Sequence, residues 1–379
     1  MEYNNAHACP PNIVVGTVLA AFICFTDLCC ESIHLPFRIR GNLSKITSKL
    51  LLAAIAGAGA VAAARIMRSK YDFENKTVLI TGGSRGLGLV LARQLADEGA
   101  KIAICARDTE ELARAKDDLE SRGADVFTEV CDVRNQDDVS RLVENVRSRF
   151  GQIDVLINNA GVIQVGPLEL QTPEDFAKAL AVHFWGPFHT MHSVLPEMRK
   201  RGEGRIVNIS SIGGKIPVPH LAPYCASKFA LAGLSSAMHA DLSKDNINIT
   251  TVYPGLMRTG SHVNAMFKGQ NEKEFALFSL GDATPLTSIG VERAAAQIID
   301  ACRYGKSELI ITIQAKAAAK MYALFPGVTS GILALVDRLL PGPGGIGTQQ
   351  ASGSDSKSTL SPSFITAGID QAAVENNEL

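Results

Sequence analysis

The chain has 379 residues, which is enough for one large α/β domain with extensions or for two smaller domains. Its formal net charge of −1 creates no strong positive field, so we expect no nucleic-acid partner. Hydrophobic residues make up 46 % of the chain and the mean hydropathy is +0.11, which is slightly apolar for a soluble enzyme. The eight cysteines show no C-x-x-C pair and no zinc-like spacing with histidine, so we expect no metal site and a reducing, cytoplasmic environment.

Residues 1–70 form an N-terminal extension with two uncharged apolar stretches, at 13–25 and 50–64. Both are shorter than the about 20 apolar residues that a spanning helix needs. Basic residues flank the second stretch on both sides, a pattern typical of helices that bind a membrane surface. We therefore expect a membrane-associated protein whose folded domain faces the cytoplasm. A soluble cytoplasmic protein, with the stretch packed on a partner, is the alternative.

Residues 72–315 alternate strand-like apolar runs with helix-like periodicity and contain no internal repeat. This alternation predicts one domain with a doubly wound, parallel, seven-stranded sheet and helices on both faces. The expected strands are 77–81, 101–105, 125–131, 153–157, 205–209, 247–253 and 308–313. The expected helices are 87–98, 108–122, 136–150, 173–200, 222–244 and 289–304.

Two further segments follow this domain. Residues 316–340 are an apolar helical segment that Pro326 and Gly327 interrupt, and which is expected to lie on a membrane surface or on another subunit. Residues 341–379 are rich in Gly, Ser, Pro and Gln, so we expect a disordered tail.

A glycine-rich turn ends the first expected strand and begins the first helix of the domain. Gly82, Gly86 and Gly88 give it the spacing T-G-x-x-x-G-x-G. A nucleotide pyrophosphate binds backbone N–H groups at the N-terminal end of a helix, where side chains would be in the way. The turn therefore predicts a dinucleotide site.

The tip of the second strand indicates which dinucleotide binds. An acidic residue there accepts a hydrogen bond from the ribose 2′-OH and selects NAD. Here the tip is Ala106 followed by Arg107, and Arg85 lies within the glycine-rich turn. Two guanidinium groups near one ribose suit a 2′-phosphate, so we expect NADPH rather than NADH. Two solvent-exposed arginines are the alternative.

Polar or small residues end the next two strands. The third strand ends at Asp132, whose carboxylate suits either the adenine amine or the cap of the following helix. The fourth strand runs into 158–161, where small and amide side chains allow a nucleotide to approach the backbone.

The residues that indicate chemistry follow the fifth strand, which ends at Ser210 and Ser211. Tyr224 and Lys228 lie on one face of the next helix at i, i+4 spacing. A nearby ammonium stabilises a phenolate and lowers the pKa of a tyrosine from about 10. Tyr224 can then exchange a proton with a carbonyl or alcohol oxygen near neutral pH, while a serine hydroxyl binds the same oxygen.

Together these motifs resemble the short-chain dehydrogenase/reductase family, in its standard NADP-dependent branch. The matching segments, in family order over about 75–260, are TGGSRGLG (81–88), NNAG (158–161), Ser211, YCASK (224–228) and PGLMRT (254–259). The resemblance implies a Rossmann fold, a homodimer or homotetramer, and hydride transfer between NAD(P) and a C=O or CH–OH group.

The resemblance also implies roles for single residues. Tyr224 would be the acid/base, Ser211 would orient the substrate oxygen, and Lys228 would bind the nicotinamide ribose and lower the pKa of Tyr224. Cofactor contacts would come from Gly82, Ser84, Arg85, Gly86, Leu87, Gly88, Arg107, Asp132, Val133, Asn159, Ala160, Gly161, Tyr224, Lys228, Pro254, Gly255 and Thr259.

One position departs from the family pattern. His183 stands where an asparagine usually supports a water in the proton relay to the lysine. An imidazole can also hold a water, so His183 is a candidate catalytic residue.

Substrate contacts in this family come from the loop at 213–223 and the excursion at 260–285. The apolar residues of the excursion are Met266, Phe267, Phe275, Leu277, Phe278 and Leu280. They predict an apolar lid for a lipophilic substrate, or side chains that only pack the lid on the domain. The leading interpretation is an NADPH-dependent reductase of a 3-keto acyl compound, long-chain ketone, or steroid- or retinoid-like carbonyl. An NAD-linked alcohol dehydrogenase and a non-catalytic nucleotide-binding scaffold are the alternatives.

Overall fold

The computed structural model describes residues 70–283, 288–357 and 367–379. The apolar stretches at 13–25 and 50–64 lie outside these ranges, so the membrane prediction made for them stays a prediction. In the described ranges, no helix combines the length and the apolar character required to cross a bilayer.

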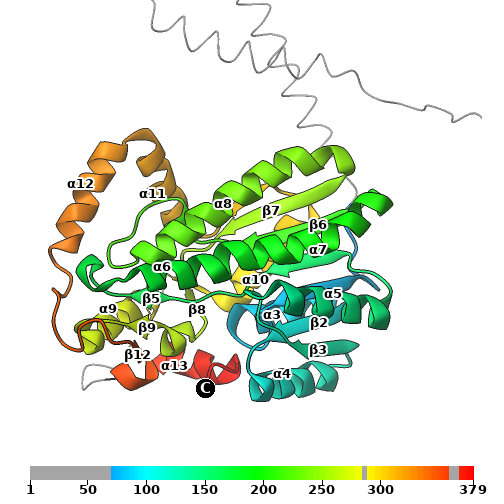
Figure 1. The fold of residues 1–379 in the computed structure, drawn as a ribbon, viewed down its shortest axis with the longest axis horizontal. Helices are drawn as coiled ribbons and strands as arrows, with labels where there is room; N and C mark the ends of the chain where they lie inside the picture. The colour runs from blue at the N-terminus through cyan, green and yellow to red at the C-terminus, as the bar shows by residue number, and fades with distance from the viewer. Residues whose placement is uncertain (1–69, 284–287, 358–366) are drawn as a thin grey trace, which may run out of the picture. The chain divides into compact units, whose positions relative to one another are not determined.

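Seven parallel strands form the central sheet in the order β11-β7-β6-β4-β1-β2-β3 (Figure 1). Their bounds are β1 (Thr77–Thr81), β2 (Lys101–Ala106), β3 (Val126–Val130), β4 (Val155–Asn158), β6 (Gly204–Ile209), β7 (Ile247–Tyr253) and β11 (Glu308–Ile310). The predicted doubly wound sheet is confirmed. Strand order reverses beside β1, and folds of this kind bind ligands at the carboxyl ends of the strands on either side of that reversal.

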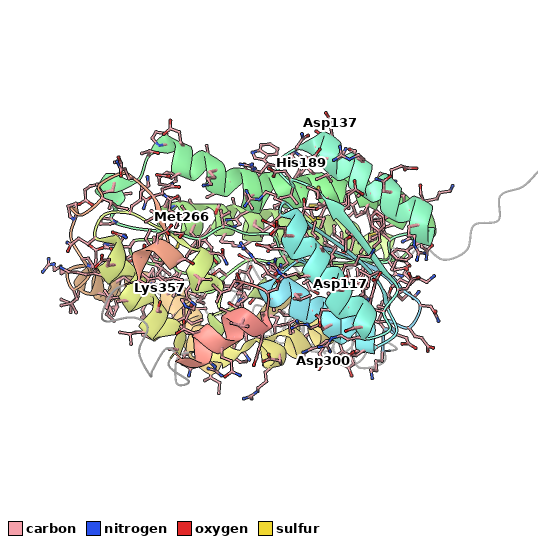
Figure 2. All side chains as sticks on the ribbon, turned by 90° about the horizontal axis from the view of Figure 1, so that it is seen from below. Asp117, Asp137, His189, Met266, Asp300 and Lys357 are labelled. Carbon is pink, nitrogen blue, oxygen red and sulfur yellow. The ribbon has the colours of Figure 1, made fainter. Side chains whose placement is uncertain are left out.

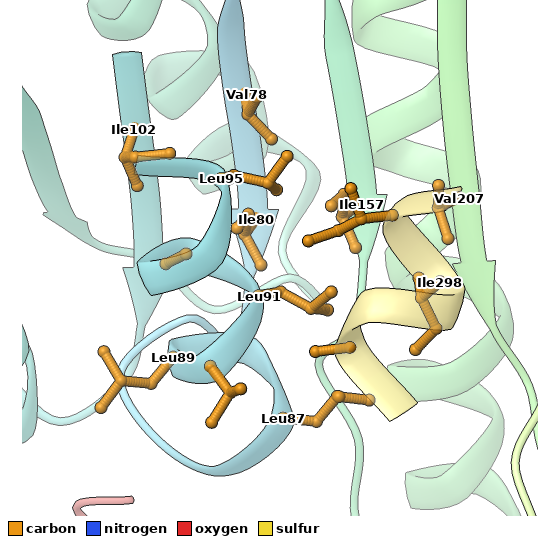
Figure 3. Close-up of a cluster of buried hydrophobic side chains, with 14 of the residues drawn as sticks. Val78, Ile80, Leu87, Leu89, Leu91, Leu95, Ile102, Ile157, Val207 and Ile298 are labelled. Atoms are coloured by element: carbon orange, nitrogen blue, oxygen red, sulfur yellow. The ribbon is translucent and has the colours of Figure 1, made fainter. Parts of the chain in front are cut away.

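Helices cover both faces of the sheet. One face packs against α3 (Gly86–Asp97), α4 (Thr109–Ser121) and α10 (Val291–Arg303), and the other against α5 (Gln136–Phe150), α7 (Gly186–Arg201) and α8 (Ala222–Leu242). Side chains of β1 alternate between these two cores, with Ile80 in the first and Leu79 in the second. Figure 3 shows Leu91 and Leu95 of α3 beside β1, and both are fully buried, as their i, i+4 spacing predicts.

The helix expected over 173–200 is interrupted. α6 (Pro173–Leu180) begins with a capping box between Thr172 and Asp175. A π-helical turn, η2 (Ala181–Trp185), then leads into α7. This turn holds His183 and turns it toward the interior.

Short strands and a lid helix add to the domain beyond the central sheet. β5 (Gln164–Val165), β9 (Met266–Phe267) and β12 (Ala351–Ser352) form a three-stranded sheet, and β8 (Leu256–Arg258) pairs with β10 (Ser288–Gly290). The lid helix α9 (Asn271–Ala283) lies against them (Figure 1). α11 (Ile313–Leu324) and α12 (Pro326–Asp337) form the interrupted helical segment that we expected over 316–340.

The prediction of a disordered tail over 341–379 is wrong for the part that the structure describes. β12 pairs antiparallel with β9, and α13 (Ala367–Glu375) packs near the lid. The side chain of Gln350 donates to Gln164 and Asp175, so the segment is held by polar groups. A composition rule that counts apolar residues cannot detect this kind of attachment.

Candidate active site

A cavity of about 1000 Å³ runs along the carboxyl ends of the strands. This size fits a dinucleotide together with a substrate, because small-molecule sites usually occupy about 300–1,000 Å³. Its lining includes every predicted site residue except Gly88: Gly82, Ser84, Arg85, Gly86, Leu87, Arg107, Asp132, Val133, Asn159, Ala160, Gly161, His183, Ser211, Tyr224, Lys228, Pro254, Gly255 and Thr259.

The glycine-rich turn is closely packed against its neighbours. Gly82 has a positive φ of 64°, and a Cβ on it would lie 2.8 Å from the Cα of Ala160. A Cβ on Gly88 would lie 2.1 Å from the Gly82 carbonyl oxygen. Gly88 therefore allows α3 to pack against the turn and does not line the cavity, while the cofactor contact expected of it stays a prediction.

The two arginines expected to read a 2′-phosphate have different surroundings. Arg85 donates from Nη1 to Glu111 Oε1 at 2.8 Å, and its Nε lies 3.4 Å from Glu378 Oε2. Arg107 is exposed at the tip of β2, and its charge helps to lower the pKa of Asp132. Arg107 is therefore the more accessible of the two guanidinium groups.

The tips of β3 and β4 are also engaged with protein groups. Arg134 donates to both carboxylate oxygens of Asp132 and is the main cause that lowers the pKa of that carboxyl. Asn159 donates from Nδ2 to the Gly82 carbonyl oxygen at 2.8 Å. Asn159 thus braces the glycine-rich turn with its side-chain amide nitrogen.

The three predicted catalytic side chains come together at the end of β6. Ser211 precedes the short helix η3 (Ile212–Gly214), and its Oγ accepts from the Gly213 N–H at 3.1 Å. Tyr224 and Lys228 project from α8, with Lys228 Nζ 5.6 Å from the centre of the Tyr224 ring. Lys228 Nζ donates to the Ile209 carbonyl oxygen at 2.8 Å, which places the ammonium beside the strand end.

Burial changes the proton affinity of both groups on α8. It raises the pKa of Tyr224 to about 12, and a hydrogen bond with Ser211 acts in the opposite direction. It lowers the pKa of Lys228 to about 7. The pKa of Tyr224 is therefore raised in this structure, and the lowering that we expected from Lys228 stays a prediction.

His183 is fully buried, and both of its ring nitrogens have protein partners. Nε2 accepts the Val162 N–H at 3.0 Å, so the proton must sit on Nδ1, which donates to Ser227 Oγ at 2.7 Å. Burial and then the Lys228 charge lower the pKa of His183 well below its ordinary value, which keeps the ring neutral. Through these two bonds the ring ties the loop after β4 to α8, and the water-holding role of His183 stays a prediction.

The predicted apolar lid divides into two groups. Phe267 and Phe275 are buried in a small core with Val165 and Ala265, so they pack the lid on the domain. Met266 and Phe278 line the cavity, whereas Leu277 and Leu280 are exposed. Part of this segment therefore packs the lid on the domain, and the lipophilic substrate expected for the other part stays a prediction.

Asp282 and Glu378 also line the cavity and were not predicted from the sequence. Asp282 of α9 is buried, which raises its pKa to about 8, and its charge would raise the pKa of Tyr224. Glu378 accepts from Asn264 Nδ2 at 2.7 Å, and burial raises its pKa to about 7 although Arg85 acts in the opposite direction. No sequence motif pointed to Asp282 or to Glu378. Among the described side chains, no group of three or more His, Cys, Asp or Glu could hold a metal.

Comparisons with known proteins agree with this geometry. The family model described as short chain dehydrogenase matches residues 76–269. The uncharacterized oxidoreductase YxnA of Bacillus subtilis is 31 % identical over 263 residues, 69 % of this chain and 72 % of that protein. A putative ketoacyl reductase of Streptomyces coelicolor is 37 % identical over 188 residues, 49 % of this chain and 72 % of that protein.

Solved structures give the same result. A gluconate 5-dehydrogenase from Burkholderia cenocepacia, in complex with NADP and tartrate, is 29 % identical with a TM-score of 0.56, over 64 % of this chain and 96 % of that one. The short-chain dehydrogenase from Streptomyces avermitilis is 27 % identical with a TM-score of 0.61, over 69 % and 97 % of the two chains. The chain therefore belongs to the short-chain dehydrogenase/reductase family, oxidoreductases that act on CH–OH and C=O groups with NAD(P).

Proposed function

We propose that this enzyme reduces a lipophilic ketone or aldehyde to the alcohol with NADPH. The observation that carries the proposal is the convergence of Ser211, Tyr224 and Lys228 on one cavity that Met266 and Phe278 also line. The relative named as a putative ketoacyl reductase favours a 3-keto acyl compound among the candidate substrates. A long-chain ketone and a steroid- or retinoid-like carbonyl remain within the same class.

Each catalytic side chain has a separate task. The bound dinucleotide supplies the hydride that reaches the carbonyl carbon. Ser211 Oγ donates a hydrogen bond to the substrate oxygen, and the hydroxyl of Tyr224 gives that oxygen its proton. Burial lowers the pKa of Lys228 to about 7. The Lys228 ammonium can therefore return a proton to Tyr224 near neutral pH.

The choice of NADPH rests on the tip of β2. Ala106 and Arg107 stand there in place of the acid that would bind an unmodified ribose. Arg107 is exposed, so its guanidinium is available to a 2′-phosphate. One similar structure contains NADP, which is consistent with the same preference. An NAD-linked alcohol dehydrogenase is disfavoured for the same reason.

The test is a reductase assay with the purified full chain, NADPH or NADH, and a panel of carbonyl compounds, followed at the NADPH absorbance. We expect turnover with NADPH and an apolar carbonyl. Turnover with NADH alone would overturn the cofactor assignment. Tight NADPH binding with no reduction across the panel would favour the non-catalytic scaffold.

We further propose that α11 and α12 bind an anionic membrane surface. Their apolar side chains are exposed, including Leu324 of α11 at 70 % and Leu335 of α12 at 60 %. Lys316, Lys320 and Arg338 flank this apolar face. An exposed apolar face with basic flanks suits the headgroup region of a membrane.

The membrane proposal predicts co-sedimentation of the full chain with vesicles of phosphatidylcholine and phosphatidylglycerol. Leu335→Glu should reduce the bound fraction, because it places a charge in the apolar face. Glu144→Gln, far from this face on α5, is the control. A full chain that stays in the supernatant with these vesicles would refute the membrane proposal.

A homodimer or homotetramer is the third part of the proposal. Trp185 at the end of η2 is 49 % exposed and contacts Phe188 of α7, which stacks on His192, so η2 and α7 together present an aromatic row. We infer that a second copy of the chain covers this row. Light scattering after gel filtration should give a dimer or larger, and Trp185→Ala should shift it toward the monomer. A monomeric wild type would contradict the inference.

A further inference from the structure

The last described segment of the chain lies against the nucleotide half of the cavity. We call residues 367–378 the tail segment: helix α13 and the three residues after it. Figures 1 and 2 show α13 between the lid and α4, in two views at right angles. The family model matches residues 76–269, so the tail segment that reaches the glycine-rich turn comes from a part of the sequence outside that match.

Backbone groups of the turn are bonded to the tail segment. The Gly86 N–H donates to the Asn376 carbonyl oxygen at 2.8 Å. Asn377 Nδ2 donates to the Ser84 carbonyl oxygen at 2.8 Å and to that of Glu111 at 3.0 Å. Gly86 is the first residue of α3, so its N–H is one of the donors that a helix N-terminus offers to a phosphate.

The Glu378 side chain fills the space that the glycine leaves open. A Cβ on Gly86 would lie 2.4 Å from Glu378 Oε1, and only 4 % of this carboxyl side chain is exposed. Its other oxygen lies 3.4 Å from Arg85 Nε and accepts from Asn264. An anionic group thus sits at the positive end of α3, beside a guanidinium, where a dinucleotide would place its pyrophosphate.

We propose that the tail segment is an internal competitor of the dinucleotide. Asn376 occupies the Gly86 N–H, and Glu378 occupies the open space beside Gly86 and the Arg85 guanidinium. The cofactor phosphates need these same groups. The tail segment must leave the turn before the cofactor can bind there. The inference rests on the proposed function only for the choice of NADPH as the probe.

When a segment competes with the cofactor, the apparent affinity for the cofactor equals its intrinsic affinity multiplied by the fraction of molecules whose site is open. Glu378→Gln removes the charge that pairs with Arg85 and keeps the shape of the side chain. It should tighten NADPH binding about three- to tenfold, the effect of one charge-assisted contact at a partly exposed guanidinium. Asn377→Ala removes both bonds to the turn and should act in the same direction. Glu375→Gln, an exposed acid on the same helix, is the matched control.

The experiment measures the Kd of NADPH by calorimetry for the full-length wild type and the three variants. Hydrogen exchange of residues 367–379 is measured with and without NADPH. We expect tighter binding in Glu378→Gln and Asn377→Ala, no change in the control, and faster exchange of the tail segment when NADPH is bound.

Two results would overturn the proposal. Weaker binding in Glu378→Gln with slower exchange on NADPH addition would mean that the tail segment closes over the cofactor. Unchanged binding and unchanged exchange would mean that the contacts do not affect the site. If the wild type binds NADH and not NADPH, the cofactor assignment fails, and the same two measurements with NADH still test the tail segment.

Discussion

The strands that carry the family motifs and the segment after α12 meet at one cavity, but different interactions hold them. β1 is fully buried between apolar side chains of α3 on one face and of α5 and α7 on the other. The segment at 341–379 reaches the domain through polar groups instead. Gln350 bonds to the small sheet region, and Asn376 and Asn377 bond to the glycine-rich turn.

This difference teaches that low apolar content does not by itself indicate disorder. A part-buried carbonyl such as that of Ser84 needs a donor, and Asn377 supplies one. Leaving such a group unpaired is destabilising by about 1–3 kcal/mol. A polar segment can therefore be ordered by completing hydrogen bonds at the edge of a core that is already built. The first region provides the chemistry, and the second controls the entrance to it.

The largest effect is expected at the catalytic centre. Tyr224→Phe should lower kcat by at least about a hundredfold, because only the proton donor is lost. The Kd of NADPH should stay nearly unchanged, because the ring still fills its place on α8. Stopped-flow or steady-state assays with calorimetry test both parts. Substantial remaining turnover would exclude Tyr224 as the acid.

A smaller effect is expected at the nucleotide tip. Arg107→Ala should raise the KM for NADPH about tenfold to a hundredfold, since one charge-assisted contact to phosphate is worth roughly 1.5–3 kcal/mol. The KM for NADH should hardly change. Arg85→Ala should change the preference for NADPH over NADH less than Arg107→Ala does, because Arg85 is already paired with Glu111 and lies near Glu378. An unchanged NADPH/NADH ratio in both variants would show that neither arginine reads the phosphate.

Asp282, a lid residue to which no motif pointed, gives a pH test. Burial raises its pKa from the ordinary 3.8 to about 8, so the folded protein favours the protonated carboxyl. The stability that this proton provides is fully present below the ordinary pKa and is lost as the pH rises toward 8. The Tm of the wild type should therefore fall from about pH 5 to about pH 8 relative to Asp282→Asn, which stays neutral. Parallel Tm curves for the two proteins would contradict this.

The smallest effect concerns the C-terminal attachment. Gln350→Ala removes the bonds to Gln164 and Asp175 and should lower the free energy of unfolding by about 1 kcal/mol. Its neighbour Gln349→Ala is the matched control, and kcat should be unchanged in both. Urea unfolding measures the difference. Equal stability of the two variants would show that the segment does not depend on these side-chain bonds.

The sequence by itself determined the family and the sheet, and it indicated the candidate catalytic residues. Apolar periodicity marks strands and helices locally, and the motifs place Ser211 after a strand end and Tyr224 and Lys228 on the next helix. Such signals depend on neighbours within a few residues, so they survive without knowledge of the fold. The i, i+4 spacing of Tyr224 and Lys228 is an example.

Only the tertiary structure decided which of these side chains are free to act. His183 has both ring nitrogens bonded, one of them to Ser227, which is 44 positions away. Gly88 lies behind the turn, and Asn377 bonds to Ser84 across 293 positions. The partners of a polar group and the desolvation that shifts its pKa depend on what the folded chain brings beside it, and no local pattern encodes those distant neighbours.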